Sequence, residues 1–71
     1  MEIIYSPHAK KRLRERKISK TAVILAINNP DKELLGDRNR IIARRRFGNR
    51  ILEVIYVKEN NQIVIITLYN L

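Results

Sequence analysis

Hydrophobic residues follow two different spacings along this chain, and the spacing changes near residue 40. Before that point, apolar residues recur every three to four positions, which is typical of amphipathic helices. After it, they fill three runs rich in β-branched and aromatic residues, which is typical of strands. A short apolar run at the start, Glu2–Tyr5, predicts one more strand, and we expect it at a sheet edge because it is short and terminal.

The first predicted helix spans Ser6–Lys17. Ser6 suits the N-cap, where its hydroxyl accepts a free amide proton, and Pro7 suits the first helical position because its φ is already fixed. A thin apolar seam borders a basic face. At about 100° per residue, one slanted stripe carries the only histidine and two arginines, with the seam beside it. The stripe is His8, Arg12 and Arg16, and the seam is Ala9 and Leu13.

The second predicted helix, Lys20–Asn28, follows a break at Lys17-Ile18 and begins at Ser19, another N-cap residue. Asn29-Pro30 ends it, because proline disfavours the helical conformation in the residue before it. The helix is apolar throughout Ala22–Ile27. Such a wide apolar surface predicts burial against more than one neighbour or against a partner chain.

The remaining chain predicts a meander of three strands joined by two-residue turns. Gly48-Asn49 and Asn60-Asn61 suit such turns, because glycine and asparagine tolerate the left-handed conformation that they require. Before the meander, Asp31–Gly36 is either a short strand or an irregular connection, and Asp37–Asn39 is turn-like. The three strands are Arg40–Phe47, Arg50–Val57 and Gln62–Tyr69.

Together these elements predict a single α+β domain over residues 1–71, with two N-terminal helices packed on one face of an antiparallel three- to five-stranded meander sheet. The turns set the register, since Phe47 should pair with Arg50 and Glu59 with Gln62. One face then carries Ile41, Ala43, Arg45, Leu52, Val54, Tyr56, Ile65, Thr67 and Tyr69. The other carries Ile42, Arg44, Arg46, Ile51, Glu53, Ile55, Val57, Val64, Ile66 and Leu68.

We expect the helices to cover the second of these faces, because its middle is a continuous aliphatic block. At its rim, Arg44 opposite Glu53 predicts an exposed cross-strand ion pair worth well under ~1 kcal/mol. The first face should stay open to solvent. It presents Arg45 near Tyr56 and Tyr69, which suits RNA, because bases stack on aromatic rings and arginine contacts phosphate. For both tyrosines the alternative is a ring packed on a half-buried sheet with a wet hydroxyl, and for Tyr56 this is the favoured interpretation.

Charge is the strongest global signal in this sequence. Fifteen Lys and Arg residues against seven Asp and Glu residues give a net charge of +8, and nine of the fifteen are arginine. Arginine suits phosphate because its planar fork makes two parallel hydrogen bonds. The excess predicts RNA, another nucleic acid or an acidic protein as partner, and a merely solubilising surface is the alternative. The arginines expected to contact nucleic acid are Arg12, Arg16, Arg38, Arg40, Arg44, Arg46 and Arg50.

The sequence lacks the residues that characterise several functional classes. The chain has no cysteine, and one histidine with scattered carboxylates gives no metal-ligand spacing. No glycine-rich phosphate loop exists, so we expect neither a metal nor a cofactor. No apolar run approaches the ~20 residues of a membrane span, and the N-terminus lacks the apolar region of a signal peptide. We therefore expect a cytoplasmic protein that does not bind membranes.

The sequence also resembles a known family, through HAKKRLRERKIS (His8–Ser19), Asn29-Pro30, a basic hairpin and the closing VIITLY (Val64–Tyr69). These features are similar to the domain of unknown function 4258. The pattern of that family has a His-Ala opening, an arginine four residues later, an Arg-Gly-Ile-Ser helix junction and a last strand ending in an aromatic residue. Lys17 stands where the family usually has glycine, so we expect either a strained lysine or a remodelled junction.

That family is similar to the RelE/ParE/BrnT toxin superfamily, in which two N-terminal helices lie over an antiparallel sheet. RelE- and BrnT-like members cut RNA, whereas ParE-like members act on gyrase. The resemblance implies a toxin-type protein whose partners are free or ribosome-associated RNA and an acidic, antitoxin-like protein. It also implies that Tyr69 corresponds to the terminal tyrosine of RelE-like nucleases, and loosely that Arg44, Arg45 and Arg46 correspond to their basic residues.

RNA cleavage without a metal needs a base for the 2′-hydroxyl, an acid for the 5′-oxygen and cations for the phosphorane. Histidine changes charge closest to neutral pH, so His8 suits either proton transfer, and a purely structural His8 is the alternative. Tyr69 can transfer a proton with help from Arg45, which completes a catalytic set of His8, Tyr69 and Arg45. Three hypotheses follow: a metal-independent endoribonuclease, a non-catalytic nucleic-acid-binding module, and a protein-interaction module with an acidic partner.

Overall fold

The computed structural model describes residues 1–71 as a five-stranded sheet with two helices. It confirms the α+β class and both helices, and it resolves Asp31–Gly36 in favour of a short strand. The elements in chain order are β1 (Glu2–Tyr5), α1 (Pro7–Arg16), α2 (Lys20–Asn28), β2 (Lys32–Leu35), a 3₁₀ turn (Asp37–Asn39), β3 (Ile41–Phe47), β4 (Arg50–Glu59) and β5 (Gln62–Asn70). Neither helix is long and apolar enough to cross a membrane.

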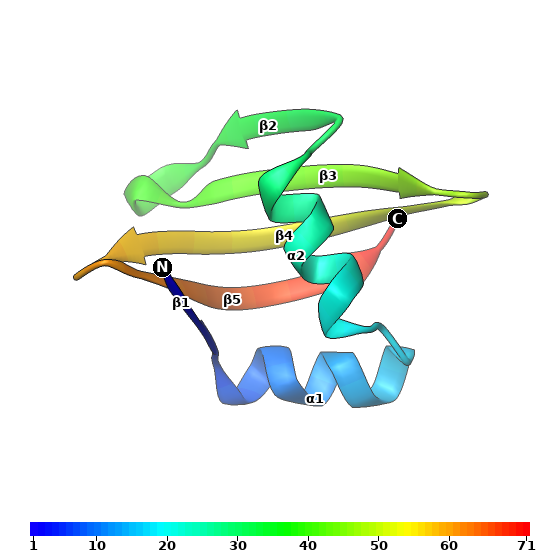
Figure 1. Cartoon of the computed structure of the whole chain (residues 1–71), viewed down its shortest axis with the longest axis horizontal. Coiled ribbons are helices and arrows are strands. Elements are labelled where there is room, and N and C mark those ends of the chain that lie inside the picture. The colour runs from blue at the N-terminus through cyan, green and yellow to red at the C-terminus, as the bar shows by residue number, and fades with distance from the viewer.

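The sheet is mixed, with the strand order β1-β5-β4-β3-β2 (Figure 1). Strands β2 to β5 pair antiparallel with their neighbours, but β1 pairs with β5 in parallel. The prediction of an antiparallel sheet is therefore wrong at this edge. The chain between β1 and β5 contains both helices and the other three strands, so no hairpin joins these two neighbours. Only a tight turn requires neighbouring strands to be antiparallel.

Local signals set the ends of the helices as predicted. The hydroxyl of Ser6 accepts the amide of Ala9 at 3.0 Å, and that of Ser19 accepts the amide of Ala22 at 3.1 Å. Lys17 ends α1 in the left-handed conformation, with φ 52° and ψ 45°. Of the two outcomes expected at this junction, the structure shows the strained lysine. Lys17 adopts the left-handed conformation that glycine adopts more easily.

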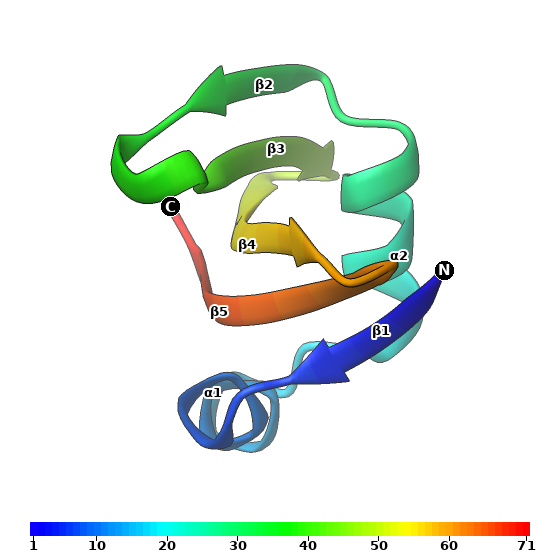
Figure 2. The same ribbon diagram turned by 90° about the vertical axis from the view of Figure 1, so that its left-hand side faces the viewer.

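The helices cover the opposite face of the sheet from the one predicted. Figure 2 shows α2 on one side of strands β3 and β4. Ala43 and Val54 lie fully buried on that side, and the small side chain of Ala43 leaves room for the helix to pack closely. The isoleucine-rich face, with Ile42 and Ile55 near its middle, is left half-buried and without a helix over it. The core consists of Ala9, Leu13, Val23, Ala26, Ile27, Ala43, Leu52, Val54, Tyr56, Ile63, Ile65 and Leu68.

A β-bulge in β5 changes which residues share a face. Tyr56 pairs with Ile65 as predicted, but Ile55 pairs with Thr67, so Ile66 is an extra residue in its strand. Beyond the bulge the register differs from the predicted one by one position. Glu53 rather than Leu52 pairs with Tyr69, which moves Tyr69 to the uncovered face. The prediction that Tyr69 and Arg45 share a face is therefore wrong.

Helix α1 lies alongside β5, beyond the end of β1 (Figure 1). The start of the helix is tied to the bulge, because the Ser6 amide donates to the Ile65 carbonyl at 3.0 Å and its hydroxyl donates to the Ile66 carbonyl at 2.8 Å. Its apolar seam, Ala9 and Leu13, is buried in the core. The polar stripe of α1 consequently runs along the margin of the sheet.

Helix α2 buries one face and exposes another. Val23, Ala26 and Ile27 are in the core, whereas Ile24 is 40% exposed and Leu25 is 37% exposed. The wide apolar surface predicted for this helix is therefore only partly buried within the chain.

Candidate nucleic-acid interface

Four polar side chains form one row across the uncovered face. Lys32 pairs with Arg44, Arg44 with Glu53, and Glu53 with Tyr69, so the row crosses β2, β3, β4 and β5 in turn. Directly paired residues on neighbouring strands point to the same face of a sheet. We call Lys32, Arg44, Glu53 and Tyr69 the cross-strand row.

Glu53 is the centre of the row. Its Oε1 accepts a hydrogen bond from Arg44 Nε at 2.6 Å, and its Oε2 accepts one from the Tyr69 hydroxyl. Only 3% of Glu53 is exposed, and it is the only charged residue in the buried set. The predicted Arg44–Glu53 pair is confirmed, but it is not an exposed rim contact. A buried carboxylate requires such partners, since leaving it unpaired is costly.

The hydrogen bond to Glu53 raises the pKa of Tyr69 above its ordinary value of 10.0. Burial and the negative charge of Glu53 raise this pKa further, while the charges of Arg44 and Arg12 lower it. Tyr69 is therefore protonated at neutral pH. The hydroxyl donates this proton to Glu53, and the raised pKa means that Tyr69 holds the proton more firmly than free tyrosine does.

Arg12, on α1, lies within electrostatic range of this site, since its charge lowers the pKa of Tyr69. His8 is one helical turn before Arg12, about 6 Å along the axis, and is exposed. The helix that carries the predicted stripe thus lies next to β5, the strand of Tyr69. The structure gives His8 no hydrogen-bond partner and no ion pair.

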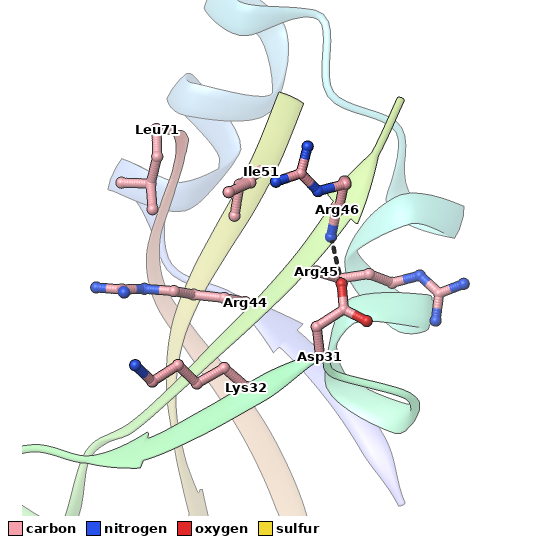
Figure 3. A pocket seen from close by; sticks show the side chains of 7 residues that line it. All are labelled: Asp31, Lys32, Arg44, Arg45, Arg46, Ile51 and Leu71. Carbon is pink, nitrogen blue, oxygen red and sulfur yellow. Dashed lines mark hydrogen bonds between the residues drawn. The ribbon is translucent and has the colours of Figure 1, made fainter. Parts of the chain in front are cut away.

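A pocket of about 430 Å³ borders the row (Figure 3). Lys32 and Arg44 extend to the same side of the sheet there, and Arg46 adds a third cation. The carboxylate of Asp31 accepts the backbone amide of Arg46 at 2.7 Å, which ties the start of β2 to β3. The residues lining the pocket are Asp31, Lys32, Arg44, Arg45, Arg46, Ile51 and Leu71.

Arg45 points the other way, as Figure 3 shows. Its Nη1 donates to the carbonyl of Asn29 at 2.8 Å, and its guanidinium lies 5.4 Å from the Phe47 ring centroid. A cation at the carboxyl end of a helix is favourable because the last carbonyls carry partial negative charge. Arg45 is therefore on the other face from Tyr69, and its guanidinium is bound to the end of α2.

The other predicted arginines are spread over two further shallow pockets. Arg38 and Arg40 line one whose floor is Ile42 and Ile55. Arg16 and Arg50 line another, near the junction between α1 and α2. Only Arg12, Arg44 and Arg46 of the seven are at the cross-strand row or its pocket. No group of three or more His, Cys, Asp or Glu side chains is placed to hold a metal ion.

Two residues of the site were not among the predicted site residues. Glu53 had a signal, because it is a single acidic residue in the otherwise apolar run ILEVIYV. Lys32 had none, because it belongs to a stretch whose strand character was ambiguous. The pairing of Lys32 with Arg44 appears only in the assembled sheet, whereas Glu53 opposite Arg44 was predicted but taken as an exposed contact at the rim.

Comparison with known proteins adds one match. No curated protein and no solved structure matches this sequence. A family model matches residues 5–70, which include both helices and the whole cross-strand row. The chain belongs to the family described as domain of unknown function (DUF4258).

Proposed function

We propose that this protein binds RNA on the uncovered face of its sheet. The observation that carries the proposal is the cross-strand row, with Lys32 and Arg44 at one end and Tyr69, within electrostatic range of Arg12, at the other. Cations on paired strands can bind phosphate without first ordering their backbone, which lowers the entropic cost of binding. The ring of Tyr69 offers a stacking surface worth ~1–3 kcal/mol per base.

Salt dependence tests this binding. The dissociation constant of a labelled single-stranded RNA should rise steeply with salt, because each phosphate contact releases counterions. Lys32→Ala and Arg46→Ala should each reduce the logarithmic slope by about 0.7. Lys58→Ala is the matched control, since Lys58 is exposed near the far end of β4. Equal effects of all three substitutions would mean that diffuse charge rather than this face binds RNA.

The same cations would also attract an acidic protein segment, and we keep such an antitoxin-like partner as a proposal. Polyglutamate serves as the competing probe in the same assay. If polyglutamate displaces RNA at much lower charge concentration than an unlabelled RNA does, an acidic protein is the better partner for this face.

One observation favours a second function at this face, the metal-independent cleavage of RNA. The charges of Arg12 and Arg44 both lower the pKa of Tyr69, in opposition to Glu53, and would stabilise the tyrosinate that remains after proton transfer. In this proposal the 2′-oxygen attacks phosphorus and the bond to the 5′-oxygen breaks. His8 takes the proton of the 2′-hydroxyl, and Tyr69 turns its hydroxyl from Glu53 to the 5′-oxygen and gives that oxygen its proton. The two arginines offset the charge that develops. Arg45 has no part in this set.

Cleavage is tested by incubating labelled RNA with the protein and a metal chelator. We expect fragments with 2′,3′-cyclic phosphate and 5′-hydroxyl ends, and a loss of rate of about 100-fold in His8→Ala and in Tyr69→Phe. Lys10→Ala is the control on α1, because Lys10 lines a separate pocket with Arg14 and Lys20. Wild-type protein that binds RNA but leaves it intact would leave binding as the function.

We further infer a toxin-type protein with a RelE-like arrangement. The order of two helices before an antiparallel meander supports this, together with the resemblance described above. Induced expression should arrest growth of a bacterial host, and expression of His8→Ala should not. Equal growth arrest by both proteins would contradict a toxin that acts through His8.

A further inference from the structure

Arg44 is held in an unusual way for a surface arginine. Glu53 accepts its Nε, the nitrogen nearest the strand, and Arg44 also lines the pocket. The carboxylate therefore fixes the side chain at its inner nitrogen and leaves the two terminal nitrogens free of hydrogen bonds within the chain. Those two nitrogens form the planar fork that matches the oxygens of a phosphate group.

The surroundings of Arg44 explain why such a hold is needed. Lys32 is its direct partner on β2, and Arg46 lies two residues along β3. These like charges would push a free guanidinium into solvent, where it samples many rotamers. Glu53 provides the opposing charge from β4, and Tyr69 occupies the second carboxylate oxygen so that the carboxylate is itself fixed.

We propose that the pocket beside the cross-strand row binds one phosphodiester group of an RNA backbone, and that Glu53 is a positioning residue that aims the Arg44 fork at it. This inference rests on the proposed RNA binding and names the ligand group and the residue that prepares its site. Lys32 and Arg46 add charge to the pocket. Glu53 does not touch the phosphate, because it is almost fully buried beneath Arg44 and Tyr69.

The sign of one substitution separates positioning from simple electrostatics. Glu53→Gln removes a negative charge next to a site for an anion, so charge alone predicts tighter binding. Loss of the charged hold on Arg44 predicts weaker binding instead. Glu59→Gln is the matched control, because Glu59 is exposed at the end of β4 and loses the same charge without touching Arg44.

The experiment measures the affinity for a short single-stranded RNA whose 2′-hydroxyls are all methylated, so that it cannot be cleaved. Wild type, Glu53→Gln, Glu59→Gln, Arg44→Lys and the double variant of residues 44 and 53 are compared at one low salt concentration. We expect Glu53→Gln to bind at least about fivefold more weakly and Glu59→Gln to bind equally or more tightly. In the Arg44→Lys background, Glu53→Gln should cause no further loss, because lysine has no fork to aim.

Three outcomes overturn the inference. Glu53→Gln that binds as tightly as Glu59→Gln would show that charge alone matters. An equal loss from Glu53→Gln in the wild-type and Arg44→Lys backgrounds would show that Glu53 acts only on the fold. If circular dichroism shows that Glu53→Gln does not fold, the affinity of Arg44→Lys for the RNA becomes the test. Wild-type affinity in Arg44→Lys would show that the fork of Arg44 has no role. Wild-type protein that does not bind RNA at all defeats the proposed function itself, which the other outcomes leave intact.

Discussion

At the scale of single residues, Glu53 shows how one buried charge organises a surface. The carboxylate lies beneath the uncovered face and is hydrogen-bonded by Arg44 on one side and Tyr69 on the other. A buried ion pair adds little stability by itself, because desolvation offsets most of the attraction. The carboxylate instead fixes the positions of the Arg44 and Tyr69 side chains. We assign phosphate binding to Arg44 and proton donation to Tyr69.

Removal of the Tyr69 hydroxyl should destabilise the protein. Tyr69→Phe leaves one oxygen of the buried Glu53 without a donor, so we expect the free energy of unfolding to fall by about 1–3 kcal/mol. Chemical denaturation measures the change. Tyr5→Phe is the matched control, because the Tyr5 hydroxyl is buried without a hydrogen-bond partner and its loss should cost little. Similar losses in the two variants would argue against a specific bond to Glu53.

At the scale of elements, the start of α1 and the bulge of β5 act as one unit. Ser6 caps the helix through the Ala9 amide and donates its own proton to the carbonyl of Ile66. The bulge changes the register so that Tyr69 faces the uncovered side, and the helix that it anchors brings Arg12 to the same place. A serine that the sequence identifies as a cap thus also holds two halves of the candidate site together.

The two N-cap serines should therefore differ in their contributions to stability. Ser6→Ala removes the cap and the bond to Ile66, and we expect a loss of about 2 kcal/mol in the free energy of unfolding. Ser19→Ala removes only an exposed cap to Ala22, for which about 1 kcal/mol is expected. Thermal and urea unfolding of both variants provide the comparison. A larger loss for Ser19→Ala would contradict the dual role of Ser6.

At the scale of the whole molecule, all three tyrosines hold their protons more firmly than free tyrosine does. Burial raises the pKa of Tyr5, burial and then the charge of Glu33 raise that of Tyr56, and the hydrogen bond to Glu53 raises that of Tyr69. In each case the folded protein keeps a proton that the unfolded chain loses above pH 10.0. The contribution of these protonated tyrosines to the free energy of unfolding is therefore full below about pH 10. It should fall as the pH rises further, through the pKa values of the folded protein.

An alkaline titration followed by the ultraviolet absorbance of tyrosinate checks this expectation. The midpoint should lie above about 10 in the folded protein and return to about 10 in denaturant. Because the absorbance reports phenol groups alone, the simultaneous titration of lysines does not obscure it. In Tyr69→Phe the remaining two midpoints should still be raised. Coincident titrations in folded and denatured protein would exclude the raised values.

Much of the fold follows from local signals in the chain. Ser6 and Ser19 mark both helix starts, and Asn60-Asn61 and Gly48 adopt the left-handed conformations that their hairpins require. The pairing of Phe47 with Arg50 and of Glu59 with Gln62 then follows, because two-residue turns leave no freedom of register. These features depend on residues close in sequence, so a single chain is enough to predict them.

The candidate site was only partly predictable, because it combines residues that are far apart in sequence. Tyr69, Arg12, Arg44 and Arg46 were predicted as site residues and lie at the cross-strand row or its pocket. Arg45 was assigned to an open face, but α2 covers that face and its carboxyl end binds Arg45, while an undetected bulge in β5 moved Tyr69 to the other face. No residue type signals a bulge at Ile66, whose carbonyl bonds to Ser6, sixty positions away.

What the sequence by itself determined is therefore the set of elements, their turns, the apolar seam of α1 and the strong positive charge. Each of these depends on nearest neighbours or on composition. The tertiary structure alone decided which face of the sheet the helices cover, and it buried Glu53 and gave it Tyr69 as a second partner beside the predicted Arg44. The physical reason is that both sheet faces are apolar enough to be buried, and α2 packs over the face on which Ala43 leaves room for it.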